Sequence, residues 1–484
     1  MVFSSIFFLY LFLPLTLLLY FVVGPRFRNY ILLTASLIFY AWGEMGYVLL
    51  MLFSIAANWL VGLLIDRAKT RGRSGKPALI AGIIINLLPL AFFKYGNFLT
   101  DNINSILAIS GWNPISLEKV HLPIGISFFT FQAISYIVDV YRSEAHVQKN
   151  PFNLALYISL FPQLIAGPIV RYFDVAKEIT ARYTTATDLR DGILRFVAGL
   201  AKKVLIANNM GVLADHVFAL PPGELSAGLA WLGLIAYTLQ IYYDFSGYSD
   251  MAIGLGRMFG FHFLENFNYP YIARSIREFW RRWHISLSSW FRDYVYIPLG
   301  GNRVGLARNY VNLVTVFFLT GLWHGASWVF VIWGLYHGLF LVLERSPAGR
   351  LLDRLPAVIQ HLYTLLVVMI GWVFFRSDTL DRALEYLAAL VNFSAPPYLD
   401  ARLFAAMNNE FYLALAAGLL FSMPLIPLAN RWLLRWHDMK SINGALLLRG
   451  VTAAALMVWM VSVVMYSSAE LISGTHNPFL YFRF

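Results

Sequence analysis

Long apolar runs recur along almost the whole chain, and they constrain its fold more than any other feature. The first four runs are Phe3–Val23, Tyr30–Trp42, Tyr47–Ile65 and Ala78–Phe93. A helix needs about 20 mostly apolar residues to cross the hydrocarbon core of a bilayer. Only 13% of the residues are charged and 59% are hydrophobic, whereas a soluble domain is about a quarter charged. The sequence therefore predicts an all-α polytopic membrane protein surrounded by lipid.

Further apolar runs bring the expected number of membrane-spanning helices to about twelve, with a range of about 10–14. They are Ile124–Val140, Phe152–Ile169, Phe196–Ala219, Leu225–Tyr243, Tyr310–Leu322, Trp328–Leu343, Val358–Phe375, Phe411–Ile426 and Ala445–Tyr466. In the second of these, Pro162 and Pro168 predict a broken or re-entrant helix, which is tolerated at membrane depth only inside protein or beside a cavity. The polar segment Arg171–Arg190 is expected to be interfacial. No polar block is long enough for a soluble domain, so residues 1–484 should form a single membrane domain.

Charged residues between the first spans predict the orientation of the chain. The loop after the third run is basic and includes Arg71, Arg73 and Lys76. Such loops stay in the cytoplasm, which places the N-terminus outside. The first run has no basic segment before it and no small-residue cleavage site after it, so we expect a retained span rather than a signal peptide.

The charge balance and the lack of cysteine limit the possible chemistry. The net charge of +11 fits basic cytoplasmic loops and does not argue for nucleic acid as a partner. The chain has no cysteine, which excludes disulfides, thiolate nucleophiles and cysteine zinc sites. We expect no metal cofactor, since the known short metal-binding and phosphate-binding motifs are missing.

Two histidines lie in a glycine-interrupted apolar stretch. Residues 321–338 read G-L-W-H-G-A-S-W-V-F-V-I-W-G-L-Y-H-G and contain His324 and His337. Apolar surroundings keep an imidazole neutral, and a neutral imidazole can accept a proton as a general base. The alternative is that each histidine only makes a hydrogen bond between helices. Glycine beside His324 loosens the helix and leaves room for a substrate, which favours His324 as the functional residue. Glu344 lies on the same helical face as His337 and could fix its tautomer or orient the helix.

Arginines alternate with aromatic residues in the segment Arg274–Arg303. This segment and the residues just after it contain seven arginines but only two acidic residues. The arginines are Arg274, Arg277, Arg281, Arg282, Arg292, Arg303 and Arg308. Arginine binds phosphate through forked donors and stacks on planar rings, as a coenzyme A thioester would require. We predict that Arg281, Arg282 and Trp283 help to bind such a donor. The alternative is an interfacial helix held by lipid phosphates and an aromatic belt.

Two smaller features also suggest functional sites. Residues 244–250 read D-F-S-G-Y-S-D, and in a helix Asp244 and Tyr248 share one face. We predict that both contribute to the donor site, although a capped helix terminus at the interface is the alternative. The last residues, Asn477–Phe484, read N-P-F-L-Y-F-R-F. We expect an extended aromatic tail that either anchors at the interface or inserts into the protein.

Several long motifs together resemble the membrane-bound O-acyltransferase superfamily, and within it the bacterial alginate O-acetyltransferase membrane subunits and their relatives. They are D-F-S-G-Y-S-D-M-A-I-G-L-G, E-N-F-N-Y-P-Y, E-F-W-R-R-W-H-I-S-L-S-S-W-F-R-D-Y-V-Y-I-P-L-G-G-N-R and G-L-W-H-G-A-S-W. The resemblance extends from Met1 to Phe484. It implies a ring of tilted helices around a thin-membrane centre, with an acyl donor entering from the cytoplasm and an acceptor from the other side.

The resemblance also implies site residues and an activity. The family's essential histidine falls on His324 and a second common polar position on His284. The implied activity is transfer of acetyl from cytoplasmic acetyl-CoA towards an extracytoplasmic polysaccharide, across a bacterial inner membrane. A separate SGNH-type transferase outside the membrane is the implied partner. Tails like the one here recur in the subfamily and in a small partner of the D-alanylating system, which suggests that Tyr481 relays the acyl group.

Two alternatives remain open from the sequence. The acceptor could be peptidoglycan instead of alginate or a similar exopolysaccharide. The protein could instead be a non-catalytic conduit that passes an acyl carrier to a partner enzyme. A conduit should tolerate a conservative replacement of His324, whereas a catalyst should not.

Overall fold

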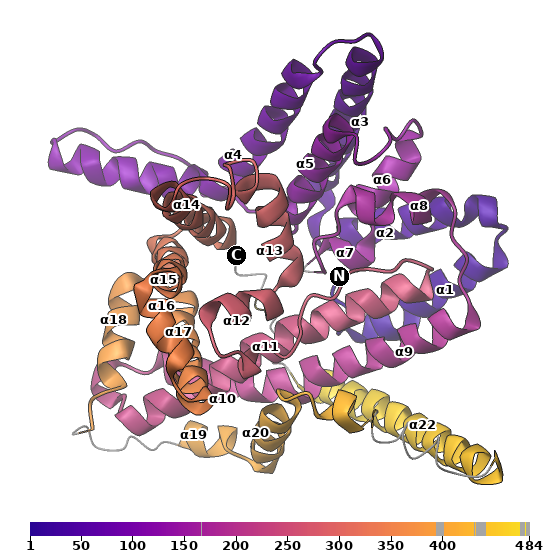
Figure 1. The fold of residues 1–484 in the computed structure, drawn as a ribbon. Coiled ribbons are helices and arrows are strands. Elements are labelled where there is room, and N and C mark those ends of the chain that lie inside the picture. Colours follow the sequence, from indigo (N-terminus) through magenta and orange to yellow (C-terminus); the bar gives the residue numbers. More distant parts are fainter. Residues whose placement is uncertain (166, 394–400, 430, 432–441, 475–479, 481–484) are drawn as a thin grey trace.

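A computed structural model describes residues 1–165, 167–393, 401–429, 431, 442–474 and 480. All regular secondary structure of these residues is helical, which confirms the predicted all-α class. Helices surround two short central ones, α12 (Ile276–Arg282) and α13 (Ile285–Phe291) (Figure 1). The long helix α11 (Ala227–Met258) passes beside them and is buried along most of its length.

The surrounding helices follow in chain order. Before the centre come α1 (Leu13–Val22), α2 (Arg28–Glu44), α3 (Val48–Thr70), α4 (Lys76–Ile109), α5 (Ile126–Arg142), α6 (Pro151–Ser159), α7 (Phe161–Leu164), α8 (Tyr172–Thr180), α9 (Ala186–Ala201) and α10 (Asn208–Ala219). After the centre come α14 (Leu306–His324), α15 (Trp328–Arg345), α16 (Pro347–Arg354), α17 (Ala357–Arg376), α18 (Leu380–Ala389), α19 (Ala401–Ala406), α20 (Asn409–Phe421) and α22 (Ile442–Ser473). Short π-helical turns precede α1 and α10, and a third, η7 (Arg292–Tyr296), follows α13.

Several of these helices can cross a membrane. Within the described residues, six helical segments are long and apolar enough; they are Pro25–Thr70, Lys76–Ile109, Ala186–Ala219, Trp328–Arg345, Ala357–Arg376 and Gly450–Ser473. Phe8–Val22 and Asn409–Phe421 are shorter apolar helices. The multi-pass membrane architecture is confirmed, while the count of about twelve spans stays a prediction.

The predicted broken helix is present. Helix α6 ends at Ser159, and α7 begins after Leu160, whose backbone is not helical (φ −53°, ψ 112°). The chain then folds back so closely that a Cβ on Gly167 would lie 2.7 Å from the carbonyl oxygen of Pro162. Helix α7 is buried, so this irregular backbone lies inside protein, as membrane depth requires.

Helix α11 runs further than its hydropathy predicts. The segment 244–250 lies inside it and is buried, so the interpretation as a capped helix terminus is wrong. The charges in this segment have partners: Asp250 lies 2.7 Å from Lys202 Nζ and 2.6 Å from Arg195 Nη2. A buried carboxylate is tolerated when it is paired and hydrogen-bonded, and hydropathy alone does not reveal that pairing.

Contacts between helix ends gather basic residues at one end of the bundle. Lys69, near the end of α3, donates to backbone carbonyls at the end of α5. Arg142, the last residue of α5, donates to the carbonyl of Asp293 at 3.1 Å. Arg345, the last residue of α15, donates to the hydroxyl of Tyr296 at 3.2 Å. We call this the basic end.

The ends of several other helices meet at the opposite end of the bundle. Glu44, the last residue of α2, accepts the backbone N–H of Ile124 at 3.3 Å, just before α5. Tyr95 of α4 donates its hydroxyl to the carbonyl of Leu322 near the end of α14 at 2.7 Å. The ends of α14 and α17 also meet here, since the rings of His324 and Phe375 lie 5.2 Å apart. We call this the cavity end, because a large cavity opens here.

Candidate functional site

His324 occupies the end of α14, where the chain leaves the helix before α15 begins at Trp328. The predicted interruption is therefore present, and the side chain of His324 is buried. Gly325 is required at this bend, because a Cβ there would lie 2.2 Å from the ring of Phe330. The space that glycine provides is thus filled by Phe330, which differs from the expectation that it admits a substrate.

The structure brings His284 and His324 together from distant parts of the sequence. Their ring centroids lie 6.5 Å apart, and Trp323 packs against both, at 6.1 Å from His284 and 4.9 Å from His324. His284 is fully buried at the start of α13 and has a left-handed backbone (φ 45°). A residue other than glycine rarely adopts this conformation unless its surroundings hold it there, as functional sites often do.

Asn266 fixes the orientation of His284. Its Oδ1 lies 3.1 Å from His284 Nδ1 and also accepts the hydroxyl (2.8 Å) and the backbone N–H (3.2 Å) of Ser286. Because this oxygen is an acceptor, the contact places the imidazole proton on Nδ1. Sequence reasoning gave Asn266 no role, although it lies in the quoted motif E-N-F-N-Y-P-Y.

Lys94 is a second residue that sequence reasoning missed. The predicted apolar run ends one residue earlier, at Phe93, but α4 continues through Lys94. Its ammonium donates to the carbonyl of Trp323 and, at 3.2 Å, to the hydroxyl of Ser127. Among the described residues no carboxylate pairs with this buried lysine. An intramembrane cation beside the predicted catalytic histidine is a functional candidate.

A cavity of about 910 Å³ reaches this group from the cavity end. Its lining includes Lys94, Asn102, Gly325, Trp328, Arg376 and Leu480. The volume is in the upper range of small-molecule sites, about 300–1,000 Å³. Gly325 directly follows His324, so the cavity comes within one residue of the buried histidine.

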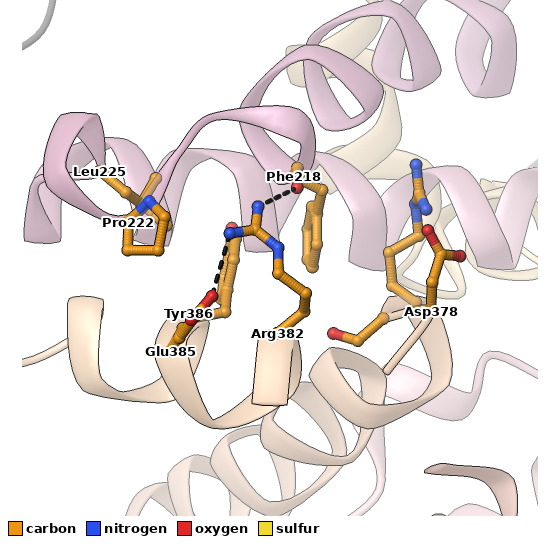
Figure 2. Close-up of a pocket in the computed structure, with 9 residues that line it drawn as sticks. Phe218, Pro222, Leu225, Asp378, Arg382, Glu385 and Tyr386 are labelled. Atoms are coloured by element: carbon orange, nitrogen blue, oxygen red, sulfur yellow. Dashed lines mark hydrogen bonds and ion pairs between the residues drawn. The ribbon is translucent and has the colours of Figure 1, made fainter. Parts of the chain in front are cut away.

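A much smaller pocket lies against the same wall (Figure 2). Its volume is about 40 Å³, which suits a few water molecules and no sugar. Arg382 donates to Glu385 at 3.0 Å and to the carbonyl of Phe218 at 3.4 Å. Arg376 pairs with Asp215 at 2.6 Å. These contacts tie the α17–α18 turn to α10 and support the wall of the large cavity.

The arginine-rich segment lies at the basic end with its aromatic side chains turned inward. Trp280, Trp283 and Trp290 are buried, and Trp283 packs 4.9 Å from Trp372. These three tryptophans therefore pack in the protein interior rather than forming a belt in lipid. Arg281 is exposed, so it is open to a ligand.

Arg282 lies beside Arg281 but makes protein contacts. Its guanidinium donates to Glu278 at 2.9 Å and to the carbonyl of Asn268 at 3.0 Å. Two adjacent arginines thus have different surroundings. Their predicted contact with the donor stays a prediction for both.

Asp244 and Tyr248 share a buried face of α11, as a helical segment predicts. Asp244 Oδ1 lies 2.7 Å from Lys203 Nζ, and its Oδ2 accepts the backbone N–H of Leu480 at 2.9 Å. The ring of Tyr248 stacks on Phe3 at 4.4 Å. These partners are residues of the chain itself, and the predicted role of both residues in donor binding stays a prediction.

His337 is buried on α15, between the rings of Trp280 and Trp333, each at 5.2 Å. Glu344 accepts the backbone N–H of Ile276 at 2.5 Å and that of Arg277 at 3.0 Å. Its carboxylate therefore satisfies the first N–H groups of α12 and does not serve the predicted tautomer contact. Tyr481 and the rest of the predicted tail, apart from Leu480, lie outside the described residues.

Comparison with known proteins agrees with this arrangement. Residues 36–355 match the profile of MBOAT, the membrane-bound O-acyltransferase family. The chain is 48% identical over 393 residues to the probable alginate O-acetylase AlgI of Pseudomonas aeruginosa, covering 81% of this chain and 75% of the relative. It is 39% identical over 428 residues to the peptidoglycan O-acetyltransferase of Helicobacter pylori, covering 81% and 80%.

A more distant similarity concerns another transfer reaction. The chain is 27% identical over 342 residues to the teichoic acid D-alanyltransferase of Bacillus subtilis, covering 66% of this chain and 81% of the relative. Acyl transfer is common to the names of these relatives, which supports an acyltransferase. By its profile match and its long, highly identical relatives, the chain belongs to the membrane-bound O-acyltransferase family.

Proposed function

We propose that this protein is a membrane O-acetyltransferase that moves acetyl from cytoplasmic acetyl-CoA across the membrane towards an extracytoplasmic polysaccharide. The observation that carries the proposal is the position of His324, buried between the arginine-rich basic end and a cavity at the opposite end whose lining includes the adjacent Gly325 and Lys94. Alginate or a similar exopolysaccharide is the favoured acceptor, because the alginate relatives are more similar than the peptidoglycan relative, at 48% against 39% identity.

His324 acts as the general base in this proposal. Its imidazole takes the proton of the attacking hydroxyl as the hydroxyl oxygen bonds to the acetyl carbon of the coenzyme A thioester. The carbon–sulfur bond then breaks, and the imidazolium returns the proton to the departing thiolate. The end of α14 carries partial negative charge, which stabilises the imidazolium while it exists. His284, oriented by Asn266, lies close enough to His324 to assist this proton transfer.

Lys94 stabilises the charge that develops on the acyl oxygen. Its ammonium is held beside His324 by the carbonyl of Trp323 and lines the cavity. A fixed cation in a water-poor site stabilises a developing oxyanion far more than it could in water. The donor itself is held at the basic end, where Arg281 is exposed beside buried tryptophans.

The same arrangement supports an orientation of the protein in the membrane. The basic end faces the cytoplasm and the cavity end faces outward, with the N-terminus outside and the protein in the bacterial inner membrane. The basic α3–α4 loop and the ends of α5 and α15 meet at one end, as the positive-inside rule requires. Cysteines introduced at Arg73 and Lys119 should react with impermeant reagents from opposite sides; reaction from the same side would contradict this orientation.

Tyr481 completes the pathway as an acyl relay to an extracytoplasmic SGNH-type partner. A phenol is more acidic than an aliphatic alcohol, so its ester gives up the acyl group more readily. The support is the neighbouring Leu480, which lines the cavity. Tyr481→Phe keeps the ring and removes the nucleophile, so it should stop acceptor acetylation. Normal acetylation by this variant, or no acetyl-tyrosine by mass spectrometry in the parent protein without the partner, would contradict the relay.

The direct test is transfer from labelled acetyl-CoA by the purified protein in proteoliposomes. Alginate oligosaccharides and peptidoglycan fragments are offered separately, each with its candidate partner. We expect labelled alginate. Labelled peptidoglycan alone would favour the alternative acceptor, and no enzyme-dependent transfer in either case would favour a conduit.

A further inference from the structure

A buried ion pair and a single residue of the C-terminal tail meet beside the large cavity. Lys203 and Asp244 are both almost fully buried, and their charged atoms lie 2.7 Å apart. Leu480 is also buried, and its backbone N–H donates to Asp244 Oδ2 at 2.9 Å. The two oxygens of one carboxylate therefore serve two different parts of the chain.

The ion pair alone does not explain its own presence. Burying two charges carries a large desolvation cost, and apolar residues of similar volume often stabilise a protein as well or better. Lys203 is fixed by a further hydrogen bond to Asn208 at 2.9 Å. A fixed cation orients the carboxylate, which leaves the second oxygen of Asp244 directed at the tail. A hydrogen bond to an ionised acceptor is roughly twice as strong as one between neutral groups.

The tail residue held in this way belongs to the wall of the cavity. Leu480 lines the cavity together with Tyr237 and Phe375. The ring of Phe375 lies 5.2 Å from that of His324. One fixed backbone position also sets the register of an extended segment, because side chains alternate between its two sides.

We propose that Asp244, oriented by Lys203, is a docking site for the backbone of the C-terminal tail and a positioning residue for the tail. Its Oδ2 accepts the N–H of Leu480 and holds this residue in the cavity wall near His324. Only the consequence for acyl transfer rests on the proposed function. The docking itself does not require that Tyr481 carries an acyl group.

The natural absence of cysteine allows a clean test. In the full-length protein carrying Leu480→Cys, the N–H is retained and the new thiol should be protected from a water-soluble maleimide. Two double variants are compared in this background. Lys203→Met with Asp244→Asn removes both charges and keeps an oxygen acceptor, whereas Lys203→Met with Asp244→Leu removes the acceptor as well.

The proposal expects the thiol to stay protected with Asn and to react at least about tenfold faster with Leu, as the loss of one such hydrogen bond predicts. Thermal unfolding and size-exclusion profiles check that both variants are folded. Equal labelling of the two variants, whether fast or slow, would overturn the proposal, because the acceptor oxygen would then make no difference.

A second pair of variants keeps the test valid if the double variants do not fold. Leu480→Pro removes the donor N–H and leaves Lys203 and Asp244 untouched, while Leu480→Met keeps the N–H. Limited proteolysis read by intact mass should remove the tail faster from the proline variant. Equal proteolysis would contradict docking.

The docking site and the acyl relay can fail separately. If the Leu480→Cys protein forms no acetyl-tyrosine but its introduced thiol stays protected, the relay is refuted and the docking site stands. If acetyl-tyrosine forms while the thiol reacts freely, the docking site is refuted and the relay stands.

Discussion

At the scale of single residues, Lys94 is the side chain whose importance the sequence conceals. It follows an apolar run, and nothing in hydropathy shows that α4 continues and carries it inward. In the structure it contacts the carbonyl of Trp323 and lines the cavity. His324 and His284, in contrast, were predicted from their motifs, and the structure places them side by side.

Lys94 provides the prediction at this scale. Lys94→Met keeps an apolar stem of similar length and removes the cation, so kcat should fall by roughly 10²–10³-fold, as for loss of an oxyanion-stabilising donor. Lys94→Arg keeps the charge and should retain more activity. Steady-state acetyl transfer in proteoliposomes measures both. A methionine variant with unchanged kcat would exclude Lys94 from the chemistry.

At the scale of elements, interruptions in helices were easier to predict than continuations. The proline-containing break between α6 and α7 and the glycine after His324 both appear where the sequence places them. The continuation of α11 through Asp244 was not predicted, because its charges are paired with residues distant in sequence. Hydropathy measures composition along the chain and contains no information about such partners.

The adjacent arginines of α12 give a matched pair. Arg281 is exposed at the basic end, whereas Arg282 is bonded to Glu278 and Asn268. Replacing both with Gln should raise the KM for the donor more than it lowers kcat. Of the single variants, Arg281→Gln should raise the KM for the donor, and Arg282→Gln should lower the thermal stability of the protein. A change in stability without any change in donor KM would remove the donor-binding role.

A histidine outside the spans links three elements and predicts a pH dependence. His262, after α11, lies 2.9 Å from Glu178 of α8 and 3.2 Å from Asp188 of α9. Partial burial favours the neutral ring, but the hydrogen bonds and charges of both carboxylates outweigh it and raise the pKa of His262 above its ordinary value of 6.5.

The stability that His262 contributes should decrease as the pH rises, because protonation and folding are linked. A raised pKa in the folded state gives stability that is complete below pH 6.5 and is lost as pH rises through the higher folded value. The melting temperature of the detergent-solubilised protein should therefore fall over that range, and His262→Gln should flatten the dependence. A variant with the same pH profile as the parent protein would contradict this contribution.

At the scale of the whole molecule, His324 lies between two ends of different character. Basic residues gather at one end, a cavity of about 910 Å³ opens at the other, and His324 lies buried between them. The sequence predicted the membrane class and the central histidines. It did not predict the cavity or the docking of Leu480 on α11, because both depend on how distant helices pack.

The central claim is that His324 performs the chemistry. His324→Gln is compared with His337→Gln, a matched change at another buried histidine of the same stretch, in proteoliposomes supplied with labelled acetyl-CoA and the acceptor system. The His324 variant should be folded but lose about 10²–10⁴-fold in transfer rate, as expected for loss of a general base, and the His337 variant should lose far less. Retention of more than about a tenth of the rate by the His324 variant would contradict the claim.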